Sequence, residues 1–295
     1  MTGGNCGASF DKLAIVVGAN GDLGHAYVQR ICAMPGYGCV GLSIEPEPRS
    51  IDLTPPNYQY IQTNMSDAGQ IQHACQQALQ IPAYQFDPKV TLIYALGTAK
   101  LELDRYCPET RREIVPVDYI EPRTWHVSVL GLRSMTQHLI SGLREKIVHA
   151  RTQGVDRFAY FRVVMFGSVF QHLGMPFFRS RSNADTHMHQ HLLQMTQTEH
   201  SDGLVPSCLH IKVSPINSQT TRAMWPFASE VRRKNWMDPM DLVDQSLPAI
   251  LDSAMPRAHE ITISKVPVPD VNAPPPDYHA MYHRLARESG YSRNT

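Results

Sequence analysis

Seven short runs of apolar and β-branched residues are spaced along the chain, each bounded by glycine, proline or polar residues. Runs of this length and composition are typical of buried β-strands. They predict strands at 13–17, 39–44, 58–62, 90–97, 158–166, 208–213 and 259–264.

Segments with a helical spacing of apolar positions lie between these runs. They predict a helix from residue 25 onward and further helices at 67–79, 123–150, 184–197 and 239–253. Alternating helices and fully apolar strands are typical of a parallel sheet with helices on both faces. We therefore predict an α/β fold, a Rossmann-like doubly wound parallel sheet with helices on both faces, in a single domain over 1–265.

The C-terminal part of the chain differs in composition. Proline is frequent in 266–276, so 266–295 is interpreted as a Pro-rich linker and a C-terminal tail. The tail contains a short helical pattern at 278–287. This helix is either solvated or docked on the domain or on a partner subunit.

Composition and charge exclude several function classes. Lys plus Arg and Asp plus Glu both number 27, so the formal net charge is zero and nothing indicates a nucleic-acid partner. No apolar run is long enough to cross a bilayer, and residues 1–12 lack the apolar core of a secretory signal. The six cysteines form no Cys-x-x-Cys pair. We expect a cytoplasmic protein with free thiols and no membrane partner.

The most informative motif joins the first strand to the first helix. Gly18, Gly21 and Gly24 have Gly-x-x-Gly-x-x-Gly spacing. Such a turn lets the backbone approach a pyrophosphate and aims the N–H groups of a helix N-terminus at the anion. Glu45 follows the second strand, where a carboxylate binds ribose hydroxyls and repels a 2′-phosphate. The motif predicts NAD or NADP, with NAD favoured by Glu45, although Arg49 nearby keeps the phosphate-binding alternative open.

This series of motifs resembles the short-chain dehydrogenase/reductase superfamily over about residues 12–265, and the resemblance implies a small substrate lid at about 216–240. The glycine spacing is that of its extended and atypical branches, and 64–67, 95–97, 166–168 and 215–220 fall on other family segments in the family's order. The predicted cofactor-binding residues, from the turn and from this resemblance, are Gly18, Asn20, Gly21, Asp22, Leu23, Gly24, Glu45, Asn64, Met65, Ala95, Leu96, Gly97, Pro215, Asn217 and Thr220.

The sequence departs from the family at its proton relay, a Tyr-x-x-x-Lys pair about thirteen residues after a catalytic serine. Ser168 matches that serine, which would orient a substrate carbonyl, but the register places Arg181 at the Tyr position and Asp185 at the Lys position. The family's helix asparagine aligns with Ser128. Arginine stays protonated near neutral pH and cannot shuttle a proton. Because Arg181 and Asp185 are spaced i,i+4, a helix ion pair is as consistent with the pattern as a catalytic role.

Histidines offer two further candidates. His172 follows Ser168 by four residues in a predicted loop at the pocket rim, and imidazole titrates near neutrality, so His172 is a candidate replacement acid/base or an ordinary loop histidine. His187 and His191 share a helix face at a spacing that a metal can bridge. With no third ligand identifiable, the sequence predicts no metal site and an interfacial or surface histidine row.

Three functions fit these observations. The leading interpretation is an NAD(P)-binding oxidoreductase with a non-standard active site that acts on a small organic carbonyl or alcohol. The alternatives are a non-redox enzyme, such as a cyclase or isomerase, and a nucleotide-binding pseudoenzyme that acts through partners. The resemblance also implies a homodimer or homotetramer paired through the helices at 123–150 and 184–199.

Overall fold

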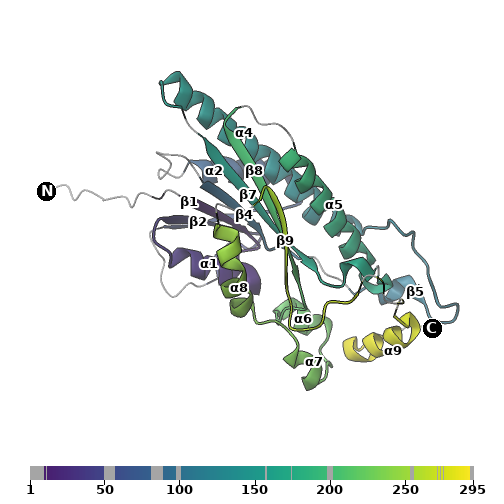
Figure 1. Ribbon diagram of the computed structural model, residues 1–295. Helices are drawn as coiled ribbons and strands as arrows, with labels where there is room; N and C mark the ends of the chain where they lie inside the picture. The colour runs from purple at the N-terminus through teal and green to yellow at the C-terminus, as the bar shows by residue number, and fades with distance from the viewer. Residues whose placement is uncertain are drawn as a thin grey trace.

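A parallel sheet organises the chain in the computed structural model, which describes residues 10, 12–49, 57–80, 89–97, 101–156, 158–173, 175–197, 202–252, 256–270, 272, 274 and 276–292. Within these residues, seven strands pair in the order β3-β2-β1-β4-β7-β8-β9, and every pairing is parallel (Figure 1). The strands are β1 (Lys12–Val17), β2 (Tyr37–Ser43), β3 (Tyr58–Gln62), β4 (Lys89–Tyr94), β7 (Ala159–Ser168), β8 (Leu204–Val213) and β9 (Ala258–Ile263). The predicted Rossmann-like fold class is confirmed.

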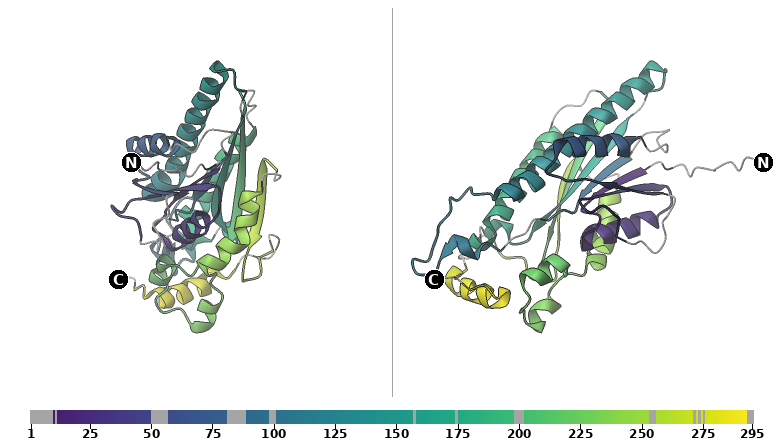
Figure 2. Two further views of the ribbon diagram at one scale, coloured as in Figure 1. Left: turned by 90° about the vertical axis from the view of Figure 1, so that its left-hand side faces the viewer. Right: turned by 180° about the vertical axis from the view of Figure 1, so that it is seen from behind.

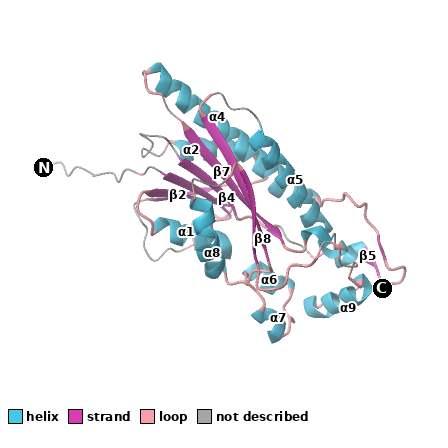
Figure 3. Cartoon of the chain, in the orientation of Figure 1, coloured by secondary structure: helices cyan, strands magenta, loops and turns pink. Residues whose placement is uncertain are grey.

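Helices cover both faces of the sheet (Figures 1, 2 and 3). One layer contains α1 (Asp22–Cys32) and α8 (Pro239–Leu251), and the other contains α2 (Ala68–Leu79), α4 (Gly131–Thr152) and α5 (Arg179–Gln197). Alternate side chains of β1 enter the two layers. Leu13, Ile15 and Val17 pack with α2, α4 and α5, whereas Ala14 and Val16 pack with α1 and α8. This burial on both faces explains why the strands are continuously apolar.

The helix predicted at 123–150 starts irregularly. A short α3 (Pro122–Thr124) leads into a π-helical segment, η2 (Trp125–Leu130), before α4 begins. The hydroxyl of Tyr94 donates a hydrogen bond to the carbonyl of Val127 (2.5 Å) inside this segment. A Cβ on Gly131 would lie 2.8 Å from the same hydroxyl and 2.7 Å from the carbonyl oxygen of Met65. Glycine therefore lets the start of α4 approach the ends of β3 and β4.

A third apolar cluster lies outside the two layers that cover the sheet, and we call it the cap. It joins η1 (Leu103–Arg105), the hairpin of β5 (Tyr106–Cys107) and β6 (Arg112–Glu113), η4 (Pro176–Phe178), the segment after α6 (Gln219–Met224), α7 (Glu230–Lys234) and α9 (Tyr278–Ser289). Its buried members are Leu103, Tyr106, Phe177, Trp225, Ala228, Trp236, Tyr282 and Leu285. The terminal helix is thus docked on its own chain, beside α7 and β5 (Figures 1 and 2).

Within the cap, an ion pair links α9 to α7. Arg232 of α7 pairs with Glu288 of α9, and the N–H of Phe227 donates to the carbonyl of Glu288 (3.0 Å). Arg232 also lies over the ring of Trp225, 4.8 Å from its centroid. No helix in the described part of the chain combines the length and apolarity that a membrane span requires.

Candidate active site

The glycine turn connects β1 to α1 at the point where the strand order reverses between β1 and β4. Gly18 has φ +79°, and its N–H donates to the carbonyl of Leu42 at the end of β2 (2.8 Å). A Cβ on Gly24 would overlap the carbonyl oxygen of Gly18, so only glycine lets α1 pack this closely on the turn. Gly21 is the N-cap of α1 and supplies no side-chain hydrogen bond, while Leu23 is buried. The N-terminus of α1 is therefore left uncapped by its own N-cap residue, at the crevice where doubly wound sheets bind ligands.

The carboxylate of Asp22, in the first turn of α1, connects this turn to two distant segments. Its Oδ2 accepts a hydrogen bond from the N–H of Gln219 at the start of α6 (2.5 Å). Its Oδ1 lies 2.8 Å from Arg49 Nη1, and its Oδ2 lies 3.7 Å from Arg222 Nη2. Burial alone would raise the pKa of Asp22, but these hydrogen bonds and charges lower it below its ordinary value. An ionised carboxylate balanced by two arginines thus lies beside the predicted pyrophosphate position.

The loop after β2 is held over the glycine turn by Asn20. The Asn20 Nδ2 donates to the carbonyl of Glu47 (2.8 Å), and its Oδ1 accepts from the N–H of Arg49 (2.8 Å). Glu45 accepts a hydrogen bond from the hydroxyl of Ser43 (2.5 Å). The predicted ribose-binding carboxylate and the alternative phosphate-binding guanidinium therefore belong to one short loop beside the turn.

The segment after β4 borders the glycine turn, and the segment after β3 packs against the start of α4. The N–H of Ala95 donates to the carbonyl of Val17 (3.1 Å), and a Cβ on Gly18 would lie 3.3 Å from the oxygen of Ala95. Leu96 also borders the turn, because a Cβ on Gly18 would lie 3.5 Å from its Cα, and Gly97 follows it in the chain. After β3, Asn64 Oδ1 accepts a hydrogen bond from the N–H of Ser66 (3.0 Å). Met65 is buried against the start of α4.

The start of the predicted lid lies between β8 and α6. Pro215 and Asn217 exchange backbone hydrogen bonds with Met237 (2.8 and 2.7 Å), which closes the lid at its base. Thr220 is exposed in the first turn of α6. Because Gln219 bonds to Asp22, the structure brings this predicted cofactor segment directly against the glycine turn.

Arg181 and Asp185 form a buried ion pair in the first turns of α5. Arg181 Nε lies 2.8 Å from Asp185 Oδ1, and Arg181 Nη2 donates to the carbonyl of Phe166 on β7 (2.8 Å). A Cβ on Gly97 would lie 3.9 Å from Arg181 Nη1, so the guanidinium lies between the ends of β4 and β7. Asp185 is fully buried, and this burial, opposed by the charge of Arg181, raises its pKa to about 6. The guanidinium, which stays protonated near neutral pH, therefore lies at the carboxyl ends of β4 and β7.

The remaining predicted catalytic residues are Ser168, Ser128 and His172, which belong to three different segments. Ser168 ends β7, two residues beyond Phe166, and its hydroxyl accepts from the N–H of Phe170 (3.1 Å). Ser128 is fully buried in the π-helical segment. His172 belongs to η3 (Gln171–Leu173), but its side chain lies outside the described part of the structure.

Three residues near the site escaped the sequence analysis. Tyr94 is buried at the end of β4 close enough to feel the charge of Arg181, and burial raises its pKa well above the ordinary value. Glu102 is buried and accepts from the N–H of Ser180, so it caps the start of α5 from a distant segment. Arg222 faces Asp22 from the lid. A tyrosine in a strand, or an acidic or basic residue in a loop, carries no sequence signal for such long-range placement.

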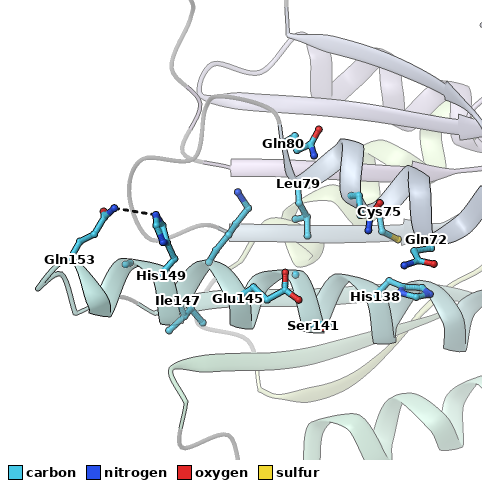
Figure 4. A pocket seen from close by; sticks show the side chains of 14 residues that line it. Gln72, Cys75, Leu79, Gln80, His138, Ser141, Glu145, Ile147, His149 and Gln153 are labelled. Atoms are coloured by element: carbon cyan, nitrogen blue, oxygen red, sulfur yellow. Dashed lines mark hydrogen bonds between the residues drawn. The ribbon is translucent and has the colours of Figure 1, made fainter.

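A groove of about 510 Å³ lies elsewhere, between α2 and the second half of α4. Figure 4 shows Cys75 and Leu79 of α2 facing Glu145 and His149 of α4, with a hydrogen bond between His149 and Gln153 (3.1 Å). Residues from the glycine turn, the Arg181–Asp185 pair and the lid are absent from its lining. This groove is therefore separate from the candidate active site.

Solved structures show the same chain fold. A short-chain dehydrogenase from Burkholderia cenocepacia in complex with NADP matches with a TM-score of 0.60 at 12% identity, covering 95% of this chain and 92% of that chain. The chain has the short-chain dehydrogenase/reductase fold. L-sorbose reductase from Gluconobacter frateurii, complexed with NADPH and L-sorbose, matches at 0.60 and 10% identity over 88% of this chain and 97% of that chain. A short-chain type dehydrogenase/reductase from Mycobacterium ulcerans matches at 0.61 and 10% identity, over 86% and 90%. No family model and no curated protein matches the sequence.

Proposed function

We propose that this short-chain dehydrogenase/reductase fold binds NAD or NADP and acts as an oxidoreductase on a small organic carbonyl or alcohol, with a non-standard active site. The observation that carries the proposal is the Gly18–Gly24 turn, where Gly24 lets α1 contact the turn and no side chain of the N-cap residue covers the helix N-terminus. The turn lies where the strand order reverses between β1 and β4, which is where doubly wound sheets bind ligands, and this position supports the proposal. Two of the named neighbours, the Burkholderia cenocepacia dehydrogenase and L-sorbose reductase, are complexes with NADP and NADPH respectively.

The residues around the crevice have distinct roles in this proposal. A bound nicotinamide would supply or accept hydride at the substrate carbon. The Ser168 hydroxyl would orient the substrate oxygen, and the Arg181 guanidinium would stabilise negative charge on it without releasing a proton. Asp185 is fully buried behind Arg181 and would act as a positioning residue. The proton would then come from water or from His172.

The buried Arg181–Asp185 pair favours a second candidate, a non-redox enzyme such as a cyclase or isomerase. A fixed cation in a water-poor crevice can stabilise a developing anion without any proton relay. The same crevice would bind a substrate in which charge is redistributed during the reaction but to which no hydride is transferred. This candidate keeps ligand binding and loses hydride transfer.

Cofactor binding is tested by titrating the protein with NADH and NADPH and monitoring the titration by calorimetry and by nicotinamide fluorescence. We expect saturable binding, and we expect Gly21→Val to abolish it because a branched side chain would fill the pyrophosphate approach. Gly69→Val, on the exposed start of α2, is the matched control and should bind as the wild type does. A folded wild type that binds neither dinucleotide at millimolar concentration contradicts the proposal.

Cofactor preference depends on the loop after β2. We propose that Glu45 favours NADH, so Glu45→Gln should raise the affinity for NADPH relative to NADH. Arg49→Gln should lower the affinity for NADPH relative to NADH, because it removes the cation that this loop offers to a 2′-phosphate. The measurement is the ratio of the dissociation constants for NADH and NADPH. If this ratio in both variants equals that of the wild type, neither residue contacts the 2′ position of the cofactor.

The chemistry is tested by restoring the family's relay. A positioned general acid contributes about 10²–10⁴-fold to rate, so the wild type should reduce simple ketones slowly. Arg181→Tyr combined with Asp185→Lys should raise that rate if the crevice holds cofactor and substrate in the family's geometry. Ser168→Ala in the double variant should remove the gain. Rapid ketone reduction by the wild type would instead show that another group moves the proton, and a cofactor-binding double variant without activity would favour the non-redox candidate.

A further inference from the structure

Two histidines and a glutamate converge between α5 and strands β8 and β9, one helical turn beyond Asp185 along α5. They are His189 on α5, His210 on β8 and Glu260 on β9, and one potential ligand atom from each lies within 4.8 Å of the others. The imidazole rings of His189 and His210 have centroids 4.6 Å apart. His210 Nδ1 lies 3.2 Å from Glu260 Oε2.

The sheet register brings these residues together. His210 and Glu260 are direct partners on the parallel strands β8 and β9, so their side chains leave the same face of the sheet. That face is the one covered by α5, because the alternate residues Leu209 and Ile211 pack in the opposite layer. His189 reaches the pair from the helix above.

The other two histidines of the same helix segment have separate partners. His187 packs edge-on against the ring of Trp125, with centroids 5.3 Å apart. His191 Nε2 lies 2.8 Å from the hydroxyl of Thr136. Of these three histidines, only His189 joins the cluster. The helical spacing had instead indicated His187 and His191 as a possible pair of ligands.

His210 is the decisive group. Its side chain is 1% exposed, and neither ring nitrogen has a hydrogen-bond partner within the described residues. A buried polar atom without a partner is uncommon and is often explained by an unplaced water or ion. In the neutral ring that carries its proton on Nε2, Nδ1 has a lone pair for a cation shared with Glu260 Oε2, which lies 3.2 Å away.

A second unpaired atom lies on the far side of the His210 ring. A Cβ on Gly167 would overlap His210 Nε2 and would lie 3.1 Å from Gln171 Oε1, so both atoms converge beside that glycine. Gln171 Oε1 is buried and has no hydrogen bond in the described structure. Its amide nitrogen is held by the hydroxyl of Thr186 (3.1 Å), which leaves the oxygen directed inward. Metal-bound histidines commonly donate their other N–H to such a carbonyl.

We propose that His189, His210 and Glu260 form a binding site for a divalent transition metal, with Zn²⁺ as the preferred ion. Two imidazoles and one carboxylate are a common zinc donor set, and three protein ligands leave a fourth position for water. Ligand atoms at zinc distances of about 2.0–2.2 Å in a tetrahedron lie roughly 3.3–3.6 Å apart. The 3.2 Å between His210 Nδ1 and Glu260 Oε2 is close to that spacing.

The surroundings define how ions reach the site and what competes with them. Glu260 is 41% exposed and His189 is half-buried, so the site opens to solvent at the edge strand β9. Lys212 Nζ lies 2.8 Å from Glu260 Oε1, the oxygen that does not face His210. This ammonium opposes a cation and weakens binding. A bound metal would fasten α5, which carries Arg181 and Asp185, to β8 and β9.

Zinc titration of the full chain, purified without a histidine tag, tests the proposal by calorimetry and by the visible absorption of Co²⁺ in the same site. We expect one saturable ion per chain. His189→Gln and Glu260→Gln should each weaken binding at least tenfold, whereas His187→Gln on the same helix should leave it unchanged. Lys212→Met should strengthen binding, because it removes the competing ammonium.

Two results would overturn this assignment. One is the absence of saturable binding at micromolar zinc in a folded wild type, which would make the cluster a metal-free contact between α5 and the sheet. The other is equal binding to wild type, His189→Gln and Glu260→Gln, which would place the ion elsewhere on the chain. Both readouts are independent of dinucleotide binding and of catalysis, so they do not depend on the proposed function.

Discussion

At the scale of single residues, Asp185 shows how burial and charge compete. Its carboxylate is fully buried and 2.8 Å from Arg181, yet burial outweighs the cation and raises its pKa to about 6. The folded protein therefore holds a proton that the unfolded chain has lost between about pH 4 and pH 6. Asp185 then contributes less to the free energy of unfolding as the pH rises through this window.

We predict a measurable consequence in the pH dependence of stability. From pH 4 to pH 6, the free energy of unfolding of the wild type should fall by up to about 3 kcal/mol relative to Asp185→Asn, at about 1.4 kcal/mol per pH unit. Urea denaturation across this range measures the difference. Asp244→Asn, which removes an exposed partner of Arg30, should keep the wild-type slope. A slope unchanged in Asp185→Asn would mean that this carboxyl stays ionised throughout.

Gly24 is a residue whose side chain is excluded by backbone. We predict that Gly24→Ala destabilises the fold by about 3 kcal/mol or more, because its Cβ would overlap the carbonyl oxygen of Gly18 and neither backbone can move freely. Thermal and urea unfolding measure the loss. Gly69→Ala, at an open position near the start of α2, should be neutral or stabilising by up to about 1 kcal/mol. Equal stability of the two variants would show that α1 can shift away from the turn.

At the scale of elements, the cap depends on a few contacts between α7 and α9. Glu288 is 15% exposed and Arg232 is 25% exposed, so removing one partner leaves a largely desolvated charge. Glu288→Gln should therefore cost about 1–3 kcal/mol and should release α9 before the sheet unfolds.

Limited proteolysis distinguishes this local release from global unfolding. The C-terminal segment of Glu288→Gln should be cleaved earlier than that of the wild type, while the sheet remains protected. Glu230→Gln removes the exposed pair between Glu230 and Lys234 on the same α7 helix, and it should leave the cleavage rate unchanged. If both variants are cleaved alike, the apolar contacts of Tyr282 and Leu285 hold α9 without the ion pair.

At the scale of the whole molecule, the assembly remains a prediction from the family resemblance. The outer side of α5 carries exposed polar residues such as Thr186 and Gln190, and that of α4 carries the exposed Val148. We predict a dimer or tetramer in which these helices pair with their copies about a two-fold axis. Light scattering should then give a mass at least twice 33.2 kDa.

A charge placed near the two-fold axis locates the interface. Gln190→Arg should weaken the assembly because the new charge would meet its own copy, whereas Gln245→Arg on α8, in the opposite layer, should not. A wild type that scatters as a 33.2 kDa particle at micromolar concentration excludes the assembly itself.

The sequence by itself determined the order and type of the sheet-forming elements. Strands such as β1 are apolar on both faces because both faces are covered. Gly18 and Gly24 reflect a positive φ and a close backbone approach, respectively, that other residues do not allow. The i,i+4 spacing also indicated the Arg181–Asp185 pair, because neighbours on one helix face are fixed by local geometry.

Tertiary structure alone decided which distant residues meet. Asp22 bonds to Gln219, Glu102 caps α5 across the chain, and α9 closes the cap, although none of these pairs has a periodic signal. The grouping of His189 with His210 and Glu260 depends on β8 and β9 being adjacent in register. Hydrophobic periodicity reports which face of an element is buried, but not which element covers it. Strand order and helix packing set those contacts, and they arise only when the whole chain folds.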